Sequence, residues 1–313
     1  CSSDLFVPAV MEHIELAGIH SGDSACILPS RNLTMDQVET IKDYTSRIAK
    51  EMHVVGLMNM QYAIEDGEVY VLEANPRASR TVPLVSKVCN IKMVKLATDI
   101  MTSHLTGRPS PVPELKEKKI PHYGVKMPVF PFKMFPEVDP VLGPEMRSTG
   151  EVLGMSPNVG EAIYKAQEAT QTRLPSEGTV LLSVNDMDKP ELIEVAKGFY
   201  ECGFKLMGTG RTYDIMKAAG LPAEKVAKID EGRPNVLDKI TNKSVNIIIN
   251  TPLDKKGLGD DSYIRKAAVK GKIPYFTNMA AAKATVQALK TIKKNGHLGV
   301  KSLQEFHSEI KEQ

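Results

Sequence analysis

Three side chains that could hold a metal ion lie on two short apolar runs in the first quarter of the chain. Gln61 belongs to the run 57–64, and Glu73 and Asn75 belong to or directly follow the run 69–74. One carboxylate and two amide oxygens make a hard-oxygen site, which suits Mg²⁺ that is held together with substrate phosphates. The residue types therefore indicate phosphate chemistry assisted by a divalent cation.

Two arginines follow this set closely. Arg77 and Arg80 would add planar donors for a phosphate or a carboxylate. The pattern also allows a simpler interpretation, in which Gln61 and Glu73 lie on a solvated sheet face without a ligand.

A second candidate site is a glycine-rich segment, residues 207–212, between a predicted strand and a predicted helix. Glycines allow backbone N–H groups to approach an anion, and the start of a helix favours negative charge. In a parallel sheet the neighbouring strand ends would bring further polar groups to the same rim. These side chains are Ser183, Lys189, Thr209, Thr212, Lys228 and Asn250. The alternative is a glycine-rich turn with unrelated surface lysines.

The elements that position the first site are a helix and a hairpin. Thr34 and Gln37 form a capping-box pattern ahead of an amphipathic helix that extends to Met52. The hairpin turns at Asp66-Gly67. A two-residue loop would pair Gln61 with position 72 and place Glu73 on the opposite face, whereas a three-residue loop would pair Asn59 with Glu73. Of these two registers, only the second gathers the polar side chains.

The second half of the chain alternates strands and helices, which predicts a parallel sheet with helices on both faces. The expected strands are 179–184, 204–207, 245–250 and 273–276, and the expected helices are 190–202, 212–219, 262–269 and 280–293. Nine prolines between 106 and 144 exclude long helices there, and a short helix is expected at 161–169. Residues 171–178 form the best linker, so we divide the chain into domains 1–175 and 176–313.

Composition narrows the class of protein. The chain has 313 residues, 40 Lys+Arg against 38 Asp+Glu, and 42% hydrophobic residues, which excludes intrinsic disorder and argues against a nucleic-acid partner. No apolar run reaches the roughly 20 residues of a membrane-spanning helix. Four widely spaced cysteines indicate neither a zinc site nor disulfides and favour a reducing cytoplasm. The start at Cys1, without an initiator Met, suggests a piece of a larger protein.

Several long motifs resemble the second ATP-grasp unit of the carbamoyl phosphate synthase large subunit, an ATP-dependent ligase. They are Leu57-Met58-Asn59-Met60-Gln61, Val71 to Pro83, Glu12 to Glu15, Gly18 to Ser24 and Leu142 to Glu151. The resemblance extends over essentially the whole chain. It implies an α/β protein: a partial ATP-grasp (α+β) domain followed by a Rossmann-like, parallel-sheet methylglyoxal synthase-like domain.

The resemblance also implies a reaction and its ligands. The family unit phosphorylates carbamate with ATP to carbamoyl phosphate, for arginine and pyrimidine synthesis. Gln61, Glu73 and Asn75 would hold Mg²⁺ or Mn²⁺, Arg80 would face the phosphate end, and His20 and Ser21 would lie near ATP. Backbone carbonyls of His13, Ile19 and Ser24 would lie near K⁺. Much of the family's ATP site precedes the motifs found here, so we expect the chain alone to be inactive.

The second half resembles the regulatory methylglyoxal synthase-like domain through residues 181–184, 208–212 and 231–234. In the family this domain binds nucleoside monophosphates such as UMP and IMP, and the six rim residues match that site. Pro252 replaces a threonine of some relatives, which puts ligand preference in doubt. Methylglyoxal synthase itself, a lyase of the same fold, needs a Gly-Gly-Asp segment where this chain has Asp230 to Pro234. A binding module is therefore favoured over a second catalytic site.

A third ligand and the partners are implied by the same family. Glu15, Asp23 and Thr277 match contacts for the activator ornithine, but Met127 replaces a third carboxylate, so we expect ornithine binding to be weak or lost. The implied partners are a glutaminase small subunit and further large subunits. The alternative function is a free-standing nucleotide-sensing module without catalysis.

Overall fold

The computed structural model describes residues 5–135, 137–252 and 260–312. Contacts between residues group the chain into two compact units. The first comprises the residues up to Glu12, Cys26–Gly124 and the residues from Val300, and the second comprises His13–Ala25 and Val125–Gly299.

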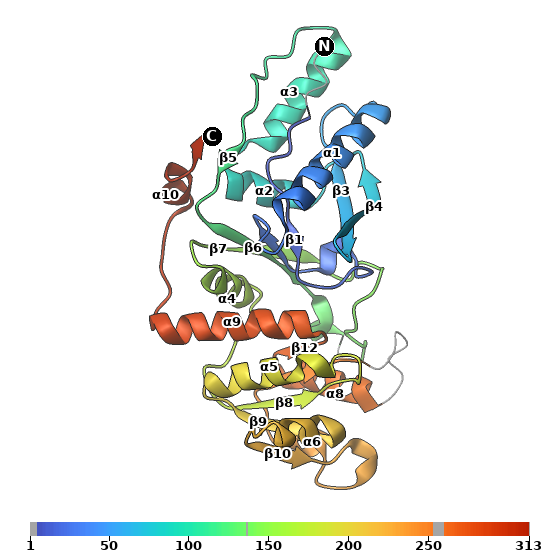
Figure 1. Cartoon of the computed structure of the whole chain (residues 1–313), viewed down its shortest axis with the longest axis vertical. Helices are drawn as coiled ribbons and strands as arrows, with labels where there is room; N and C mark the ends of the chain where they lie inside the picture. The colour runs from blue at the N-terminus through green and yellow to red at the C-terminus, as the bar shows by residue number, and fades with distance from the viewer. Residues whose placement is uncertain (1–4, 136, 253–259, 313) are drawn as a thin grey trace. The chain divides into compact units, whose positions relative to one another are not determined.

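The first unit contains a helix packed on a two-stranded antiparallel hairpin (Figure 1). Helix α1 (Met35–Glu51) begins at a capping box in which Thr34 and Gln37 bond each other's backbone N–H groups, as predicted. The hairpin consists of β3 (Asn59–Glu65) and β4 (Glu68–Asn75). The Tyr62 hydroxyl lies 2.6 Å from the Thr45 hydroxyl of α1. The Tyr62 face of β3 therefore lies against the helix.

Two contacts hold the C-terminal helix of the first unit in place. Phe306 of α10 (Leu303–Ser308) is buried and meets the His122 ring edge-on at 5.0 Å between centroids. The ring nitrogen Nε2 of His307 lies 2.6 Å from the carbonyl oxygen of Lys87. These contacts attach α10 to α2. The other elements are β2 (Cys26–Leu28), α2 (Thr81–Cys89), α3 (Met93–Thr106), β5 (Lys118–Lys119) and β13 (Lys311–Glu312), which pairs with β5.

In the described part of the proline-rich stretch, no α-helix follows the end of α3 at Thr106, as predicted. It contributes β6 (Tyr123–Val129) to a four-stranded sheet with the order β1-β2-β6-β7. The other elements of this region are β1 (Glu12–His13), the 3-10 helices η1 (Ser21–Asp23) and η2 (Pro131–Met134), β7 (Gly150–Ser156) and α4 (Val159–Ala169). Gly154 is required in β7, because a Cβ there would lie 2.2 Å from the carbonyl oxygen of Ala162 in α4.

The second unit contains the parallel sheet predicted for the second half. Its strand order is β10-β9-β8-β11-β12, and every pair of neighbours is parallel. Because the chain crosses from β10 to β11 on the other side of β8, the strand order reverses beside β8, where such sheets bind ligands. The strands are β8 (Thr179–Ser183), β9 (Lys205–Thr209), β10 (Ala223–Val226), β11 (Ile247–Asn250) and β12 (Tyr275–Phe276).

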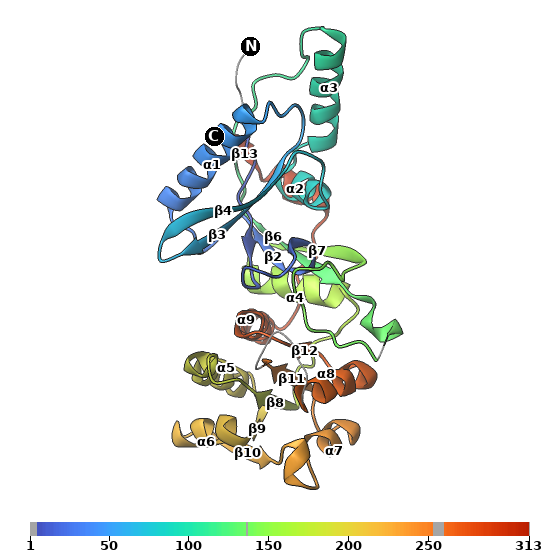
Figure 2. The same ribbon diagram turned by 90° about the vertical axis from the view of Figure 1, so that its right-hand side faces the viewer.

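Helices cover both faces of this sheet (Figure 2). Val180, Leu182 and their neighbours pack under α5, α6 and α9, whereas Leu181 and Ile248 pack under α7 and α8. The alternation follows from the two-residue period of a strand. The helices are α5 (Lys189–Glu201), α6 (Gly210–Ala218), α7 (Val236–Thr241), α8 (Asp260–Gly271) and α9 (Met279–Asn295), and the short 3-10 helix η3 spans Ile229–Glu231. β10, η3 and α7 were not predicted.

The compact units do not follow the predicted boundary at residue 175. Helix α4, which precedes the boundary, packs closely on α9, which follows it: a Cβ at Gly160 would lie 2.2 Å from Oγ1 of Thr291. Helix α4 therefore belongs to the same compact unit as the parallel sheet. The division into domains 1–175 and 176–313 stays a prediction. Cys26, Cys89 and Cys202 are buried without a disulfide, and Cys1 lies outside the described residues. No helix in the described ranges is long and apolar enough to cross a bilayer.

Candidate functional sites

The hairpin reaches its register in a way that neither sequence alternative anticipated. Asp66 and Gly67 both have positive φ, +51° and +87°, and form a two-residue turn, so that Tyr62 pairs with Val71. An irregularity at the next position then pairs Gln61 with Glu73. Leu72 is the extra residue of this β-bulge. Our prediction that a two-residue loop would separate Gln61 from Glu73 is therefore wrong, because the bulge shifts β4 by one residue.

The bulge gathers the polar side chains on one face. Asn59 pairs with Asn75, two residues from the Gln61–Glu73 pair on each strand. The side-chain amide nitrogen Nε2 of Gln61 donates to Oε2 of Glu73 at 2.6 Å. Because Tyr62 points toward α1, these side chains point to the opposite face of the hairpin. Val71, in contrast, no longer shares a face with Glu73.

This arrangement fits a cation with few protein ligands. Gln61 is linked to Glu73 through its amide nitrogen, and rotation of the amide would turn its oxygen toward the same place. Within the described ranges, no group of three or more His, Cys, Asp and Glu side chains is arranged so that it could hold a metal ion. A single carboxylate with amide oxygens therefore corresponds to a site in which substrate phosphates complete the shell.

The two arginines follow the end of β4 directly. Arg80 is exposed and occupies the position before α2. Arg77 is exposed and donates to the carbonyl oxygen of Ala78 at 3.1 Å. Both guanidinium groups are therefore at the surface beyond the polar end of the hairpin.

His20 and Ser21 lie in a loop that is held by buried polar contacts. Nδ1 of His20 accepts a hydrogen bond from the N–H of Gly22 at 3.0 Å, and His20 precedes η1. The carbonyl oxygen of Ser21 accepts from Nζ of Lys126 at 2.9 Å, and Lys126 is buried. The two residues suggested for ATP are thus adjacent on one rigid turn.

Two of the residues suggested for ornithine are carboxylates that already accept hydrogen bonds from neighbouring loop residues. Asp23 is buried, and its oxygens accept from the backbone N–H groups of Arg147 and Ser148 at 2.7 and 2.8 Å. Glu15 accepts from the Ser24 hydroxyl at 2.8 Å and from the N–H of Ala25 at 2.6 Å. Burial raises the pKa of Glu15, and these hydrogen bonds oppose the shift. Both carboxylates therefore stabilise loop structure.

Two further positions complete that set. Thr277 is half-buried and directly follows β12, and Met127 is buried in β6. A thioether offers no charge to an ammonium group, so the weak ornithine binding expected from Met127 stays a prediction.

The rim of the parallel sheet brings together the side chains predicted for a phosphate ligand. Ser183, Thr209 and Asn250 are the last residues of β8, β9 and β11. Lys189 is the first residue of α5. Lys228 follows β10, and its Cε would lie 3.4 Å from a Cβ added at Gly210, so it passes beside the start of α6. The carboxyl ends of the strands thus carry the candidate site, as predicted.

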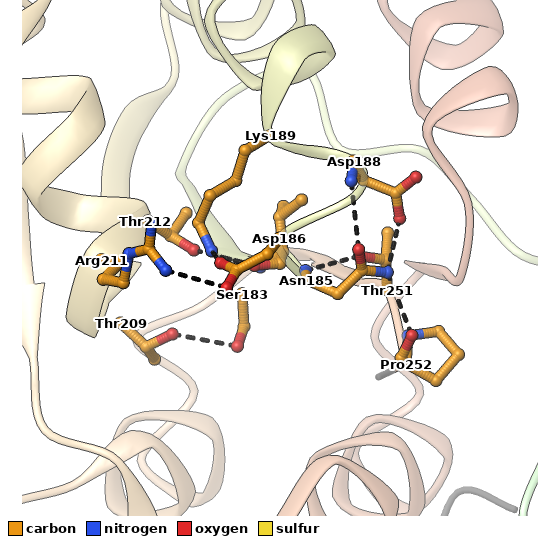
Figure 3. Close-up of polar contacts among 11 residues, drawn as sticks. Ser183, Asn185, Asp186, Asp188, Lys189, Thr209, Arg211, Thr212, Thr251 and Pro252 are labelled. Carbon is orange, nitrogen blue, oxygen red and sulfur yellow. Dashed lines mark hydrogen bonds and ion pairs between the residues drawn. The ribbon is translucent and has the colours of Figure 1, made fainter. Parts of the chain in front are cut away.

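The two threonines of the glycine-rich segment have different roles. Thr209 donates from Oγ1 to the Ser183 hydroxyl at 2.9 Å, which joins the ends of β8 and β9 (Figure 3). The hydroxyl of Thr212 is buried and exchanges hydrogen bonds with the N–H and the carbonyl of Val184, at 3.2 and 3.3 Å. Thr212 therefore fixes the loop after β8 rather than pointing a hydroxyl outward. Gly208 permits this close packing, since a Cβ would lie 3.0 Å from the Tyr213 backbone.

Two cations at the rim share one carboxylate. Asp186 is hydrogen-bonded through Oδ1 to Nζ of Lys189, and its Oδ2 accepts from Nη1 of Arg211 at 2.8 Å (Figure 3). The hydrogen bond from Lys189 holds the pKa of Asp186 below its usual range. The prediction named Lys189 as a ligand-binding residue but missed Asp186.

Asn250 belongs to a buried network. Its Oδ1 accepts from Nη1 of Arg265 at 3.0 Å, and its Nδ2 donates to Asp261 at 2.9 Å. Arg265 is fully buried and donates to both carboxylate oxygens of Asp139, at 2.8 and 2.7 Å. Asn250 therefore positions the strand end. Neither Arg265 nor Asp139 was predicted, because 126 residues separate them and no local pattern connects them.

Two family profiles match this chain, one in its N-terminal part and one in its C-terminal part. The family profile described as "Carbamoyl-phosphate synthase L chain, ATP binding domain" matches residues 7–105, which include the hairpin. The profile described as "MGS-like domain" matches residues 191–277, which include most of the parallel sheet.

Similar proteins extend this match over nearly the whole chain. The chain is 45% identical over 310 residues to a carbamoyl phosphate synthase large chain of Methanosarcina barkeri, covering 99% of this chain and 77% of that protein. It is 45% identical to a carbamoyl phosphate synthase large chain, C-terminal section, of Aquifex aeolicus, covering 97% of this chain and 60% of that protein. It is 47% identical to the large chain of Archaeoglobus fulgidus, covering 98% of this chain but only 28% of that protein. The chain belongs to the carbamoyl phosphate synthase large chain family.

Proposed function

We propose that the chain is the C-terminal part of a carbamoyl phosphate synthase large chain, in which ATP phosphorylates carbamate to carbamoyl phosphate for arginine and pyrimidine synthesis. The observation that carries this proposal is the shared face of Gln61, Glu73 and Asn75 on the hairpin, within the segment that matches the ATP-binding family. A bulge that brings these three side chains together is unnecessary for a solvated sheet face, whereas a cation site requires it.

The roles of the side chains follow from their chemistry. Gln61, Glu73 and Asn75 would hold Mg²⁺ or Mn²⁺, which would supply positive charge against the phosphate oxygens. Arg80, at the surface beyond β4, would bind the oxygens at the phosphate end.

The turn at His20 would contribute to the nucleotide site. His20 and Ser21 would lie beside ATP, and backbone carbonyls of His13, Ile19 and Ser24 would bind K⁺. The hydrogen bonds from Gly22 to His20 and from Lys126 to Ser21 support the rigidity that such a site needs.

We also propose that the rim of the parallel sheet binds a nucleoside monophosphate of the UMP or IMP type. Lys189, Arg211 and Lys228 supply positive charge, and Ser183 and Thr209 supply hydroxyl groups, at strand ends where such sheets bind ligands. Ornithine binding at Glu15, Asp23 and Thr277 is expected to be weak, because Met127 brings no charge.

The proposed partners are a glutaminase small subunit and further copies of the large chain, in the cytoplasm. Because the 313 residues span only 28% of the Archaeoglobus fulgidus protein, we expect these residues by themselves not to carry out the reaction.

One experiment separates this proposal from a nucleotide-sensing module without catalysis. Mn²⁺ binding to the 313-residue chain, measured by electron paramagnetic resonance with ATP present, should weaken about tenfold or more in Glu73→Gln. Glu65→Gln, at the turn end of the same strand pair, is the matched control. If Glu73→Gln and the control bind Mn²⁺ equally while UMP still binds in calorimetry, the chain is a nucleotide-sensing module without catalysis.

Activity of the chain alone provides a second test. We expect no ATP-dependent formation of carbamoyl phosphate from bicarbonate and ammonia by the purified chain. Measurable product would contradict the expectation that these 313 residues are inactive by themselves. Release of methylglyoxal from dihydroxyacetone phosphate would instead show that the C-terminal part acts as a methylglyoxal synthase.

A further inference from the structure

Two of the cations at the sheet rim, Lys189 and Arg211, are already paired with an anion of the chain itself. Asp186 lies in the short loop between β8 and α5, and its two carboxylate oxygens are bonded to two different side chains. Lys189 begins α5, and Arg211 lies in the first turn of α6. One carboxylate thus bridges the starts of two helices, with one oxygen for each cation.

This bridge has the shape of a bound phosphate. An oxyanion with two oxygens on a lysine and an arginine is how proteins commonly hold phosphate groups. Ser183 and Thr209 lie beside the bridge at the strand ends (Figure 3). A phosphate monoester arriving at this rim would need the same two cations, so it would have to replace the carboxylate.

The backbone around Asp186 is held, whereas its side chain is not buried. The N–H of Asn185 donates to the Thr251 hydroxyl at 2.9 Å, and the N–H of Asp188 donates to Oδ1 of Asn185 at 3.0 Å. The Asp186 side chain is 60% exposed, in contrast to 13% for Lys189. Rotation of the Asp186 side chain would therefore free Lys189 and Arg211 for a ligand without unfolding the loop. Such a rotation costs little, because exposed ion pairs contribute little free energy.

We propose that Asp186 is an internal competitor of the regulatory phosphate, which occupies Lys189 and Arg211 in the unliganded chain and sets the affinity of the rim for phosphate monoesters. This inference rests on the proposed nucleotide site. A phosphate dianion carries about twice the charge of the carboxylate and displaces it, whereas a ligand with a single carboxylate gains nothing by the exchange. The competition therefore favours phosphate monoesters over carboxylate metabolites.

Replacing the carboxylate tests the competition directly. Calorimetric titration of the 313-residue chain with inorganic phosphate and, separately, with UMP should give a dissociation constant about three- to tenfold lower in Asp186→Asn than in the wild type. The factor should be the same for the two ligands, because the competition concerns only the phosphate group that they share. Asp186→Glu, which keeps the charge, should retain the wild-type constants.

The matched control is Glu201→Gln at the far end of α5. Glu201 forms an exposed ion pair with Lys290, so the substitution makes the same change in net charge away from the rim. If Glu201→Gln tightens phosphate binding as much as Asp186→Asn, or if Asp186→Asn leaves binding unchanged or weaker while the wild type binds UMP, the competition is refuted and the nucleotide site stands. If neither the wild type nor Asp186→Asn binds UMP or phosphate, the proposed nucleotide site itself is wrong.

Discussion

Asp139 and Arg265 should contribute unequally to stability, although they form one ion pair. Arg265 of α8 is fully buried, whereas the Asp139 side chain is 27% exposed. In Asp139→Asn the guanidinium would stay buried and lose its counter-charge, and of its two bonds to residue 139 only one to the amide oxygen would be retained beside the bond to Asn250. In Arg265→Met the buried charge disappears, and the carboxylate that remains can turn toward water. We therefore expect Asp139→Asn to be the more destabilising change.

The magnitudes follow from the burial of the charge that each variant leaves behind. Removing one partner of a buried pair costs about 3–5 kcal/mol, and the partial exposure of Asp139 places Asp139→Asn near 3 kcal/mol. Arg265→Met should cost about 1–2 kcal/mol, because methionine fills much of the volume and no charge is left buried. At about 1.4 kcal/mol per factor of ten, Asp139→Asn would lower the folded-to-unfolded ratio more than a hundredfold.

The pH dependence has a definite sign. Burial works to raise the pKa of Asp139, but the hydrogen bonds from Arg265 and Ser262 outweigh it and hold this pKa below the usual range. A carboxyl whose pKa is lower in the folded state stabilises the fold above its unfolded pKa of about 3.9 and loses that contribution as the pH falls through the lower folded value. The difference between the wild type and Asp139→Asn should therefore shrink below about pH 4.

Urea unfolding at pH 7, followed by far-ultraviolet circular dichroism, measures these differences as shifts in the transition midpoint at constant slope. Glu137→Gln is the control. Glu137 lies two residues before Asp139 and forms an exposed ion pair with Lys270, which belongs to α8 like Arg265. The control should unfold with the wild type. A midpoint of Asp139→Asn equal to that of Glu137→Gln, or a larger loss in Arg265→Met, would refute the argument.

Two further predictions concern backbone packing and a buried histidine. Gly154→Ala should lower the thermal midpoint by several degrees in calorimetry, because its Cβ would lie 2.2 and 2.4 Å from backbone atoms of Ala162 and Ala166, which cannot move aside; an unchanged midpoint would contradict this. His122 is buried with Nε2 3.0 Å from the Val88 carbonyl oxygen, and burial lowers its pKa, so the unfolded chain takes up a proton first and stability should fall as the pH drops below about 6.5. His122→Gln should flatten the midpoint-against-pH curve in that interval, and an equally steep curve would show that another group is responsible.

Local patterns in the sequence predicted the elements that depend on local rules. The capping box at Thr34 and Gln37 does begin α1, because both bonds lie within one helical turn. The alternation of strands and helices predicted a parallel sheet, and Ser183, Thr209 and Asn250 indeed end its strands. Side-chain periodicity and chain direction suffice for such statements.

The hairpin register could not be predicted in this way. Asp66-Gly67 correctly indicated a tight turn, and the positive φ of both residues confirms it. The turn alone, however, would have placed Gln61 and Glu73 on opposite faces. The bulge at Leu72 reverses that outcome by shifting the alternation of β4 by one residue, and no glycine or proline in β4 marks the position of the shift. The site thus depends on one residue whose type carries no signal.

The sequence also did not predict which side chains the candidate residues contact, and these contacts change what the residues do. Residue type marked Lys189 and Asn250 as ligand-binding candidates, yet Lys189 is bonded to Asp186 and Asn250 is bonded to Arg265. The first contact could have been inferred, since a carboxylate three residues before a lysine at a helix start is within reach. The second could not, because it depends on the fold. A cation at a sheet rim therefore indicates an anion site, but its affinity depends on whether the chain supplies an anion of its own.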